Sequence, residues 1–429
     1  MKIQAVKGTR DFYPEDMIKR NFITDLWKQV SLRNGFVEYD GPIFEHLAMY
    51  QIKSGDEIAS QLFSLEDRGG RMLAIRPEIT PTLARMVNQR INTLPRPIKW
   101  FSVPRLCRAE RPQKGRLREF FQWNIDVIGV EDCLADAEVI FCAADFLLAT
   151  GLGADDFVVR ISSRSLIAAL LEYFGIEKQG LEKVYAILDK KSRVPAETFE
   201  KMLEDVISDS KKRQKVLELM SIDSLDKLKD IAGADEKTNQ AIDELKQLFG
   251  YLDVMGIADL CRFDIGIVRG LAYYTGIVFE IYDKGSELRA VCGGGRYDNL
   301  LADLGGPKIS ATGFGMGDCV LGIILEEKGI FKNSAQANSV EYFVAFADDA
   351  LQNQALKLVA KLRRAGVKTD FSYKAGSLGK QLKQAGLSNA AKCIIIGQEY
   401  TQAGQLVVKD MTAGSQQNVT EKDFFDRLR

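Results

Sequence analysis

A charged stretch at residues 108–122 carries the side chains best suited to nucleotide chemistry. Arg108 and Glu110 are two residues apart, so on a strand they face the same side. A guanidinium that is always charged can hold a phosphate, and the neighbouring carboxylate can accept a hydrogen bond from an amino group. Phe120, after a loop rich in further cations, can stack on a flat base. The alternative is a charged, solvated hairpin.

A second segment, residues 268–276, combines one arginine with two tyrosines. Gly270 follows Arg269 and allows a ligand to approach the backbone closely. Tyr273 and Tyr274 point to opposite faces if the segment is extended, so that one of them can offer its hydroxyl to a pocket. The alternative is that both tyrosines only pack in a sheet.

Two shorter segments supply further groups of this kind. Glu78 and Thr80 place a carboxylate and a hydroxyl two residues apart, a pair that can hold an ammonium group. The alternative is a surface pair of Arg76 with Glu78. The glycine run at 293–295 admits a backbone close to a phosphate or a substrate, or else forms a tight turn. The sequence contains no G-x-x-x-x-G-K-[ST] motif, which excludes a P-loop.

The composition limits the classes of function. The chain has 429 residues, 46% hydrophobic and 27% charged, which suits an intracellular globular protein of two or three domains. Because the chain has a single histidine, His46, His–His metal sites are excluded. His46 itself is expected to be a partly buried structural residue. The seven cysteines include no C-x-x-C pair, which argues against a zinc site. A net charge of −1 means that a nucleic acid would need a local basic surface.

Apolar periodicity predicts the elements that position the first segment. Residues 17–33 have helical spacing and end before a glycine, and residues 37–44 are typical of a strand. Residues 98–108 and 120–129 are expected to pair as antiparallel strands on either side of a polar turn. Residues 134–150 are expected to form a helix that a glycine terminates.

The second half of the chain changes character twice. Residues 162–255 lose glycine and gain charge, which favours an all-helical module inserted into a larger domain. Strands and glycine-rich turns return at 263–326, and a polar linker follows at 330–338. Strands and helices then alternate through 339–429, typical of a small α/β domain with a mostly parallel sheet. This last part has 13 Lys and Arg residues against 9 Asp and Glu, which is compatible with contacts to a phosphate backbone.

Taken in order, these segments resemble class II aminoacyl-tRNA synthetases of the histidyl-tRNA synthetase family. Residues 108–122 are similar to motif 2, and residues 269–275 to the histidine-specific motif Arg-Gly-Leu-Asp-Tyr-Tyr-Thr. Residues 293–298 are similar to the second histidine-specific motif. Residues 8–14 resemble the N-terminal signature of the family, and residues 36–44 fit the dimer-forming motif 1. The resemblance covers nearly the whole chain.

The resemblance implies an α+β fold. An antiparallel-sheet catalytic domain would comprise residues 1–161 and 256–329, with a helical insertion at 162–255. A linker at 330–338 would lead to a C-terminal α/β anticodon-binding domain at 339–429. The implied activity is that of a cytoplasmic homodimer, which activates histidine with ATP and Mg²⁺ and loads it onto tRNA(His).

The resemblance also implies roles for individual residues. Arg108 would hold the α-phosphate of ATP and Arg116 the outer phosphates, while Glu110 and Phe120 would contact the adenine. Arg108 and Arg269 would be the catalytic residues. Histidine would be bound through its ammonium group by Glu78, Thr80 and Gln122, through its imidazole by Asp126 and Tyr274, and also by Tyr273 and Arg269.

Two positions depart from the pattern of the family. Ala272 stands where the histidine-specific motif has Asp. Cys319 and Val320 stand where motif 3 has Glu and an ATP-contacting Arg. The second departure keeps an alternative open: a catalytically silent, synthetase-like regulatory subunit of ATP phosphoribosyltransferase in histidine biosynthesis. Such subunits usually lack the anticodon-binding domain and have eroded motif 2 and Arg269 segments, whereas this chain keeps that domain and both segments. A binding-only sensor of uncharged tRNA is a third possibility.

Overall fold

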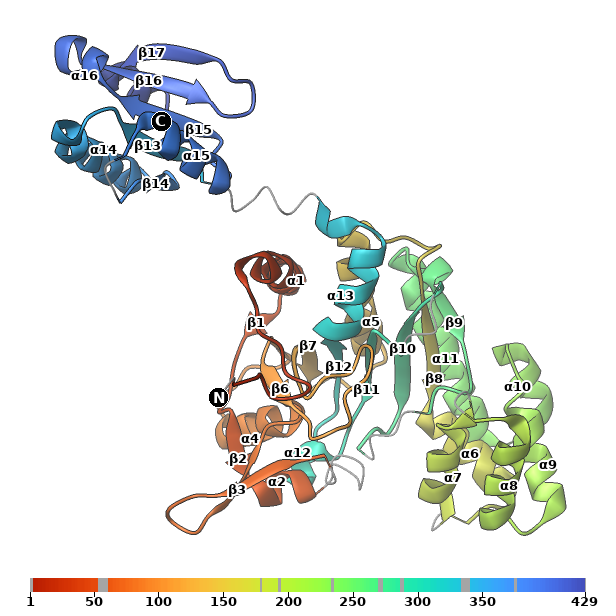
Figure 1. Cartoon of the computed structure of the whole chain (residues 1–429). Coiled ribbons are helices and arrows are strands. Elements are labelled where there is room, and N and C mark those ends of the chain that lie inside the picture. Colours follow the sequence, from red (N-terminus) through yellow and green to blue (C-terminus); the bar gives the residue numbers. More distant parts are fainter. Residues whose placement is uncertain are drawn as a thin grey trace. The chain divides into compact units, whose positions relative to one another are not determined.

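The structure, a computed structural model, describes residues 3–52, 61–177, 180–191, 194–232, 235–268, 273–285, 289–332, 340–373 and 376–428. The chain forms two compact units, Met1–Phe331 and Lys332–Arg429 (Figure 1). Among the described residues, no helix combines the length and the apolar character that crossing a membrane requires.

A nine-stranded sheet forms the centre of the first unit. Its strands run in the order β1-β5-β7-β12-β11-β10-β8-β9, with β6 added beside β7. All neighbours are antiparallel except β1–β5 and β8–β9, which confirms the predicted antiparallel sheet. The strands are β1 (Val37–Glu38), β5 (Ile98–Ser102), β6 (Arg105–Cys107), β7 (Glu119–Ile128), β8 (Phe157–Ser163), β9 (Cys261–Phe263), β10 (Ile277–Asp283), β11 (Cys292–Arg296) and β12 (Ala311–Gly317).

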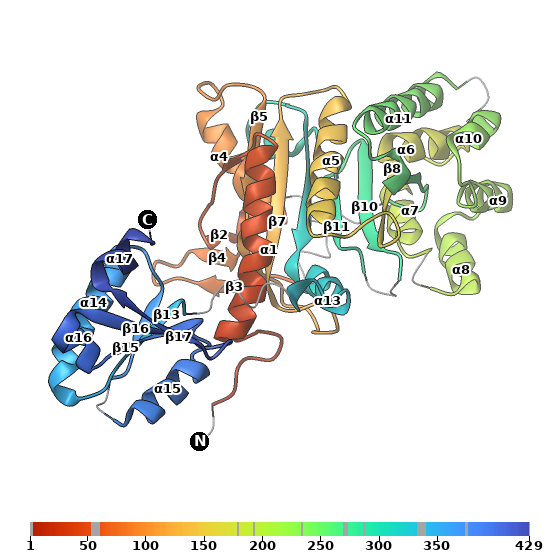
Figure 2. The ribbon, with the colours of Figure 1, turned by 90° about the horizontal axis from the view of Figure 1, so that it is seen from above.

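Three helices, α1 (Pro14–Arg33), α5 (Leu134–Ala149) and α13 (Asp318–Glu327), pack beside this sheet (Figure 2). Trp27 of α1 and Phe146 of α5 are fully buried against Trp123 of β7, with ring centroids 6.2 and 5.3 Å from that indole. The Trp123 Nε1–H donates to Ser31 Oγ at 2.8 Å, which satisfies a buried polar group. The helices predicted at 17–33 and 134–150 are confirmed as α1 and α5.

A small three-stranded sheet, ordered β2-β4-β3, corrects one prediction. Residues 37–44 do not form one strand, because Val37 and Glu38 belong to the central sheet and Phe44 begins β2 of the small one. Gly41 and Pro42 separate the two pieces. His46, the last residue of β2, is exposed rather than partly buried. The elements here are β2 (Phe44–His46), β3 (Phe63–Glu66), β4 (Met72–Ile75), α2 (Leu47–Gln51), α4 (Thr80–Arg90) and α12 (Leu300–Asp303).

The chain between β8 and β9 forms a group of helices, as predicted from the low glycine content and the high charge of this stretch. Leu245, Leu248 and Leu252 form one fully buried face of α11, at the helical spacing seen in the sequence. Asp209 and Asp235 accept hydrogen bonds from backbone N–H groups at the starts of α9 and α11. The helices are α6 (Arg164–Tyr173), α7 (Leu181–Leu188), α8 (Ala196–Val206), α9 (Ser210–Leu219), α10 (Leu225–Ala232), α11 (Glu236–Val254) and the 3₁₀ helix η3 (Ala258–Leu260).

The second unit is an α/β structure around a five-stranded sheet, ordered β14-β13-β15-β16-β17. The pairs β13–β14 and β13–β15 are parallel, whereas β15–β16 and β16–β17 are antiparallel. The prediction of a mostly parallel sheet is therefore wrong. Strand β16 pairs antiparallel with β15, and β17, whose polar sequence shows no apolar alternation, pairs antiparallel with β16. The elements are β13 (Tyr342–Phe346), β14 (Thr369–Phe371), β15 (Lys392–Ile396), β16 (Gln405–Asp410), β17 (Gln416–Thr420), η5 (Asp349–Leu351), α14 (Gln352–Arg364), α15 (Leu378–Leu387), α16 (Gln398–Ala403) and α17 (Glu421–Asp426).

Candidate active site

A cavity of about 780 Å³ in the first unit is lined by strands of the central sheet. Strand β7 contributes Phe120, Gln122, Asn124 and Asp126, four residues at the spacing of two that puts side chains on one face of a strand. The residues between them, such as Trp123, are buried in the core on the other face. The alternation in the sequence of β7 therefore separates a core face from a cavity face.

This one cavity brings together residues that are far apart in the sequence. Ten of the eleven residues singled out from the sequence line it. The eleventh, Arg269, lies outside the described residues, as does Ala272. The residues that line the cavity are Glu78, Thr80, Arg108, Glu110, Arg116, Phe120, Gln122, Asp126, Tyr273 and Tyr274.

Asp126 lies on the wall of the cavity with 3% of its surface exposed. The Tyr297 hydroxyl donates to Asp126 Oδ1, and Oδ2 has no hydrogen-bond partner among the described residues. The pKa of Asp126 is raised to about 7, mainly by burial; the Tyr297 hydrogen bond lowers it in part, and the charge of Glu78 raises it. Gly313 on β12 leaves room for this carboxylate, since a Cβ there would lie 2.3 Å from Oδ1.

Glu78 is the second buried carboxylate of the cavity, at 4% exposure. The Tyr273 hydroxyl donates to Glu78 Oε2 at 3.1 Å, so Tyr273 orients this carboxylate. The side chain of Gln122 packs against Gly315 of β12, where an added Cβ would lie 2.7 Å from the Gln122 amide nitrogen. Glu78 and Gln122 therefore offer the carboxylate and amide oxygens that an ammonium group requires.

Arginines occupy another part of the cavity wall. Arg108 donates from Nε to the Pro77 carbonyl oxygen at 3.0 Å, and its guanidinium carbon is 5.4 Å from the Phe120 ring centroid. Arg116 forms an ion pair with Glu110. A nucleotide that uses both of these side chains must therefore replace this internal pair with its own contacts.

The N-terminal segment supports this wall from outside. The Gly8 carbonyl oxygen accepts from the Arg118 N–H at 2.8 Å, and the positive φ of +89° at Gly8 suits glycine. Arg10 pairs with Asp318 at 2.6 Å, and Asp318 Oδ1 accepts from the Phe121 N–H at 2.9 Å. The sequence signature at residues 8–14 thus ties β7 to the start of α13.

Two kinds of cavity residue were missed in the sequence. Tyr297 belongs to a segment that the sequence did single out, but its contact with Asp126 spans 171 positions and leaves no local pattern. Arg289 lines the cavity from the connection between β10 and β11, where no periodicity marks it. The glycine run forms the interior of β11 rather than a tight turn, and Gly293 lines the cavity with its backbone.

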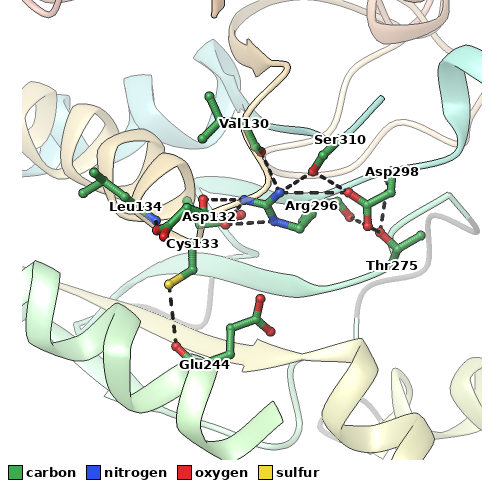
Figure 3. A network of polar contacts seen from close by, with 10 residues as sticks. Val130, Asp132, Cys133, Leu134, Glu244, Thr275, Arg296, Asp298 and Ser310 are labelled. Carbon is green, nitrogen blue, oxygen red and sulfur yellow. Dashed lines mark hydrogen bonds and ion pairs between the residues drawn. The ribbon is translucent and has the colours of Figure 1, made fainter. Parts of the chain in front are cut away.

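Arg296, the residue before Tyr297, anchors β11 through a network of polar contacts (Figure 3) that includes a buried ion pair with Asp136. Arg296 donates from Nε to Asp136 Oδ2 at 2.9 Å, from Nη1 to the Val130 carbonyl oxygen at 2.9 Å and from Nη2 to the Asp132 carbonyl oxygen at 3.0 Å. The side chains of Arg296 and Asp136 are 5% and 1% exposed. Burial raises the pKa of Asp136, and the charge of Arg296 opposes that shift. The pair ties β11 to the start of α5.

We expect Arg296→Met to lower the free energy of unfolding by about 3–5 kcal/mol, because it leaves the Asp136 carboxylate buried without its partner. Urea denaturation of the purified chain measures this loss. Arg160→Met is the matched control: its pair with Asp264 spans 3.3 Å on the surface, and its loss should cost less than about 1 kcal/mol. Equal losses in the two variants would contradict the structural role of Arg296.

Comparisons with known proteins agree with the fold. The family model described as histidyl-tRNA synthetase matches residues 8–317, and that of the anticodon binding domain matches residues 326–429. A histidine–tRNA ligase of Opitutus terrae is 39% identical, with 98% of each chain covered. A chloroplastic/mitochondrial histidine–tRNA ligase of Arabidopsis thaliana is 39% identical over 98% of this chain and 86% of its own. The crystal structure of a histidyl-tRNA synthetase from Nostoc sp. PCC 7120 superimposes with a TM-score of 0.82 at 25% identity, covering 100% of this chain and 99% of that one. The chain belongs to the histidyl-tRNA synthetase family.

Proposed function

We propose that this chain activates histidine with ATP to histidyl-adenylate and transfers the histidyl group to the 3′ end of tRNA(His). One observation carries the proposal: the buried acceptor Asp126 and the cation Arg108 line the same cavity. The first suits the N–H of an imidazole, and the second suits a phosphate. Full-length similarity to histidine–tRNA ligases supports it.

The reaction needs positioning and charge neutralisation rather than a side-chain nucleophile. A carboxylate oxygen of histidine attacks the α-phosphorus of ATP, and an O–P bond forms. The bond from that phosphorus to the β-bridging oxygen breaks, and its electron pair leaves with pyrophosphate. In the second step the terminal ribose hydroxyl of tRNA attacks the activated carbonyl and displaces AMP.

Different side chains of the cavity are assigned to different parts of histidine and ATP. We assign Glu78, Thr80 and Gln122, with Tyr273, to the ammonium group of histidine, and Asp126 and Tyr274 to its imidazole. Glu110 and Phe120 are assigned to the adenine, and Arg108 and Arg116 to the phosphates. Arg269, placed by the family motif alone, is assigned to the carboxylate and the α-phosphate.

Magnesium would enter this cavity together with ATP. The described residues contain no group of three or more His, Cys, Asp or Glu side chains that could hold a metal ion. A Mg²⁺ bound to phosphates and water needs only one or two protein carboxylates, and Glu110 is a carboxylate near the arginines. When bound, the ion would neutralise phosphate charge.

The same proposal covers the domains. Residues 1–161 and 256–329 would form the catalytic domain, 162–255 the helical insertion, 330–338 a linker and 339–429 the anticodon-binding domain. Helices α6 to α11 within residues 162–255, and the separate five-stranded sheet within residues 339–429, support this division. The excess of basic residues in the last range suits a tRNA backbone.

A homodimer in the cytoplasm completes the proposal. Large apolar side chains are exposed on β1 and the small sheet, among them Val37 at 61%, Phe44 at 55% and Met72 at 48%. Exposed apolar side chains of this kind suit a protein contact surface, and residues 36–44 resemble the dimer-forming motif of the family. All seven cysteines are free, as expected in a reducing compartment.

Two assays test the proposal. ATP–pyrophosphate exchange should depend on histidine, and histidine should be esterified to tRNA(His). Pure, folded protein without histidine-dependent exchange would reject the ligase. That result would favour the regulatory subunit, which the retained C-terminal unit and the similarity to full-length ligases do not favour. Exchange without transfer to tRNA would reject the second step.

A further inference from the structure

One part of the cavity wall is apolar where the family places an arginine. Val320, near the start of α13, lines the cavity and is only 8% exposed. Its Cγ2 packs close to Gly115 of the hairpin loop, where an added Cβ would lie 3.0 Å away. The outer phosphates of ATP therefore meet no cation from position 320.

Two nearby cations are engaged elsewhere. Arg10 pairs with Asp318 at 2.6 Å and its guanidinium lies over the Phe12 ring, so its charge is already compensated. Lys114 is 69% exposed and lies 3.5 Å from Glu327. Both residues are absent from the lining of the cavity as the structure describes it.

Arg289 differs from both. It lines the same cavity as Val320 and Arg116, and its side chain is exposed. Among the residues that the structure describes, it forms no hydrogen bond or ion pair. A guanidinium on the wall of a cavity, with no such partner among the described residues, is available to an anionic ligand.

The strand register places Arg289 at the end of the sheet where Val320 lies. Cys292 of β11 pairs with Met316 of β12 in an antiparallel ladder. Three residues before Cys292 is Arg289, and three residues beyond Met316 is Cys319, the neighbour of Val320. The chain segments that carry Arg289 and Val320 therefore leave the ladder at the same end.

We infer that Arg289 binds the β- and γ-phosphates of ATP in this chain and takes over the part of the motif 3 arginine. The inference rests on the proposed function and adds a catalytic residue to it. In the activation step, the bond between the α-phosphorus and the bridging oxygen breaks and charge moves to the departing pyrophosphate. Arg289 stabilises that charge and, in the reverse reaction, binds pyrophosphate.

Arg289→Met in the full chain tests this role by ATP–pyrophosphate exchange at saturating histidine. We expect kcat/KM for ATP to fall about 10- to 100-fold, the loss expected for one hydrogen bond to a charged group. The KM for pyrophosphate should rise, and the KM for histidine should stay within about twofold, because Arg289 contacts only phosphates. Arg289→Lys should recover part of the loss, since lysine restores the charge but not the fork of donors.

Arg90→Met is the matched control, because Arg90 is exposed at the end of α4 and does not line the cavity. It should exchange as the unchanged chain does. A value of kcat/KM for ATP in Arg289→Met within about threefold of the unchanged chain would overturn the inference, and so would equal losses for ATP and histidine.

Direct binding separates this inference from the proposed function. Isothermal titration calorimetry with pyrophosphate needs no catalysis, and Arg289→Met should weaken pyrophosphate binding at least about tenfold, as expected for a lost charge-assisted contact. Unchanged affinity would overturn the role of Arg289 even in a chain that exchanges. Failure of exchange in the unchanged chain would reject the proposed function alone, while the binding comparison still decides the role of Arg289.

Discussion

Arg108→Ala is expected to lower the rate of histidine-dependent ATP–pyrophosphate exchange by about 10²- to 10³-fold, the range for removal of a preorganised donor at a reacting centre. The hydrogen bond from Nε to the Pro77 carbonyl at 3.0 Å and the contact with the Phe120 ring hold the guanidinium in place before ATP arrives. The loss should appear in kcat, because the α-phosphate gains charge only during the reaction. Single-turnover formation of the adenylate measures it.

Arg105→Ala provides the control, from the strand that leads to Arg108. Arg105 lies on β6 three residues before Arg108, and its side chain is 46% exposed and 3.0 Å from Glu119. It is not part of the cavity lining, so its loss should change exchange less than about threefold and stability by less than about 1 kcal/mol. Arg108→Lys should remain strongly impaired, because lysine lacks the planar fork. If Arg108→Ala kept more than about a tenth of the rate, the assignment to the α-phosphate would be wrong.

Local pattern was sufficient to predict the wall of the site that one hairpin forms. The alternation in residues 98–108 and 120–129 predicted two antiparallel strands, and β5, β6 and β7 confirm them. The same alternation separates Phe120, Gln122 and Asp126 from the core residues between them. A strand with one buried face records its orientation in its own sequence.

Contacts between distant strands left no such record. The break between Glu38 and Phe44 depends on pairing with β5 and β4, which periodicity cannot show. Tyr297 reaches Asp126 only because β7, β12 and β11 are consecutive in the sheet. Arg289 lies in the connection between β10 and β11, and only the ladder of β11 with β12 relates it to Val320. Its use could not be predicted before that ladder was known.

Asp126→Asn is expected to weaken histidine binding while it stabilises the empty protein. The carboxylate is buried, and burial raises its pKa to about 7. At pH 4 the folded form is protonated and the unfolded form, with an ordinary pKa of about 3.9, is roughly half ionised, so the two proteins should differ in stability by only about 0.5 kcal/mol. As the pH rises to 7, the unfolded form ionises first and the folded chain loses stability, by at most roughly 4 kcal/mol at pH 8. Asparagine is neutral throughout and escapes this loss.

Denaturant unfolding between pH 4 and pH 8 measures this difference, and Asp259→Asn is the matched control. Asp259 is exposed in η3, so its replacement should leave the pH dependence of stability unchanged. A variant Asp126→Asn that followed the pH dependence of the unchanged chain would show that Asp126 is ionised in the empty protein. The side chain would then need a buried partner that the described residues do not supply.

Histidine binding should improve as the pH rises, whereas the stability of the empty protein should fall. An ionised Asp126 accepts the imidazole N–H of histidine, so the KM for histidine of the unchanged chain should fall as the pH rises through about 7. Asp126→Asn should raise that KM about 10²-fold or more, as when a site built to bond a polar group loses its partner. The imidazole of free histidine titrates in the same range, but it affects both proteins alike, so the ratio of the two KM values isolates Asp126. A ratio that stays constant from pH 6 to pH 8 would mean that the two imidazole nitrogens are bound elsewhere in the cavity.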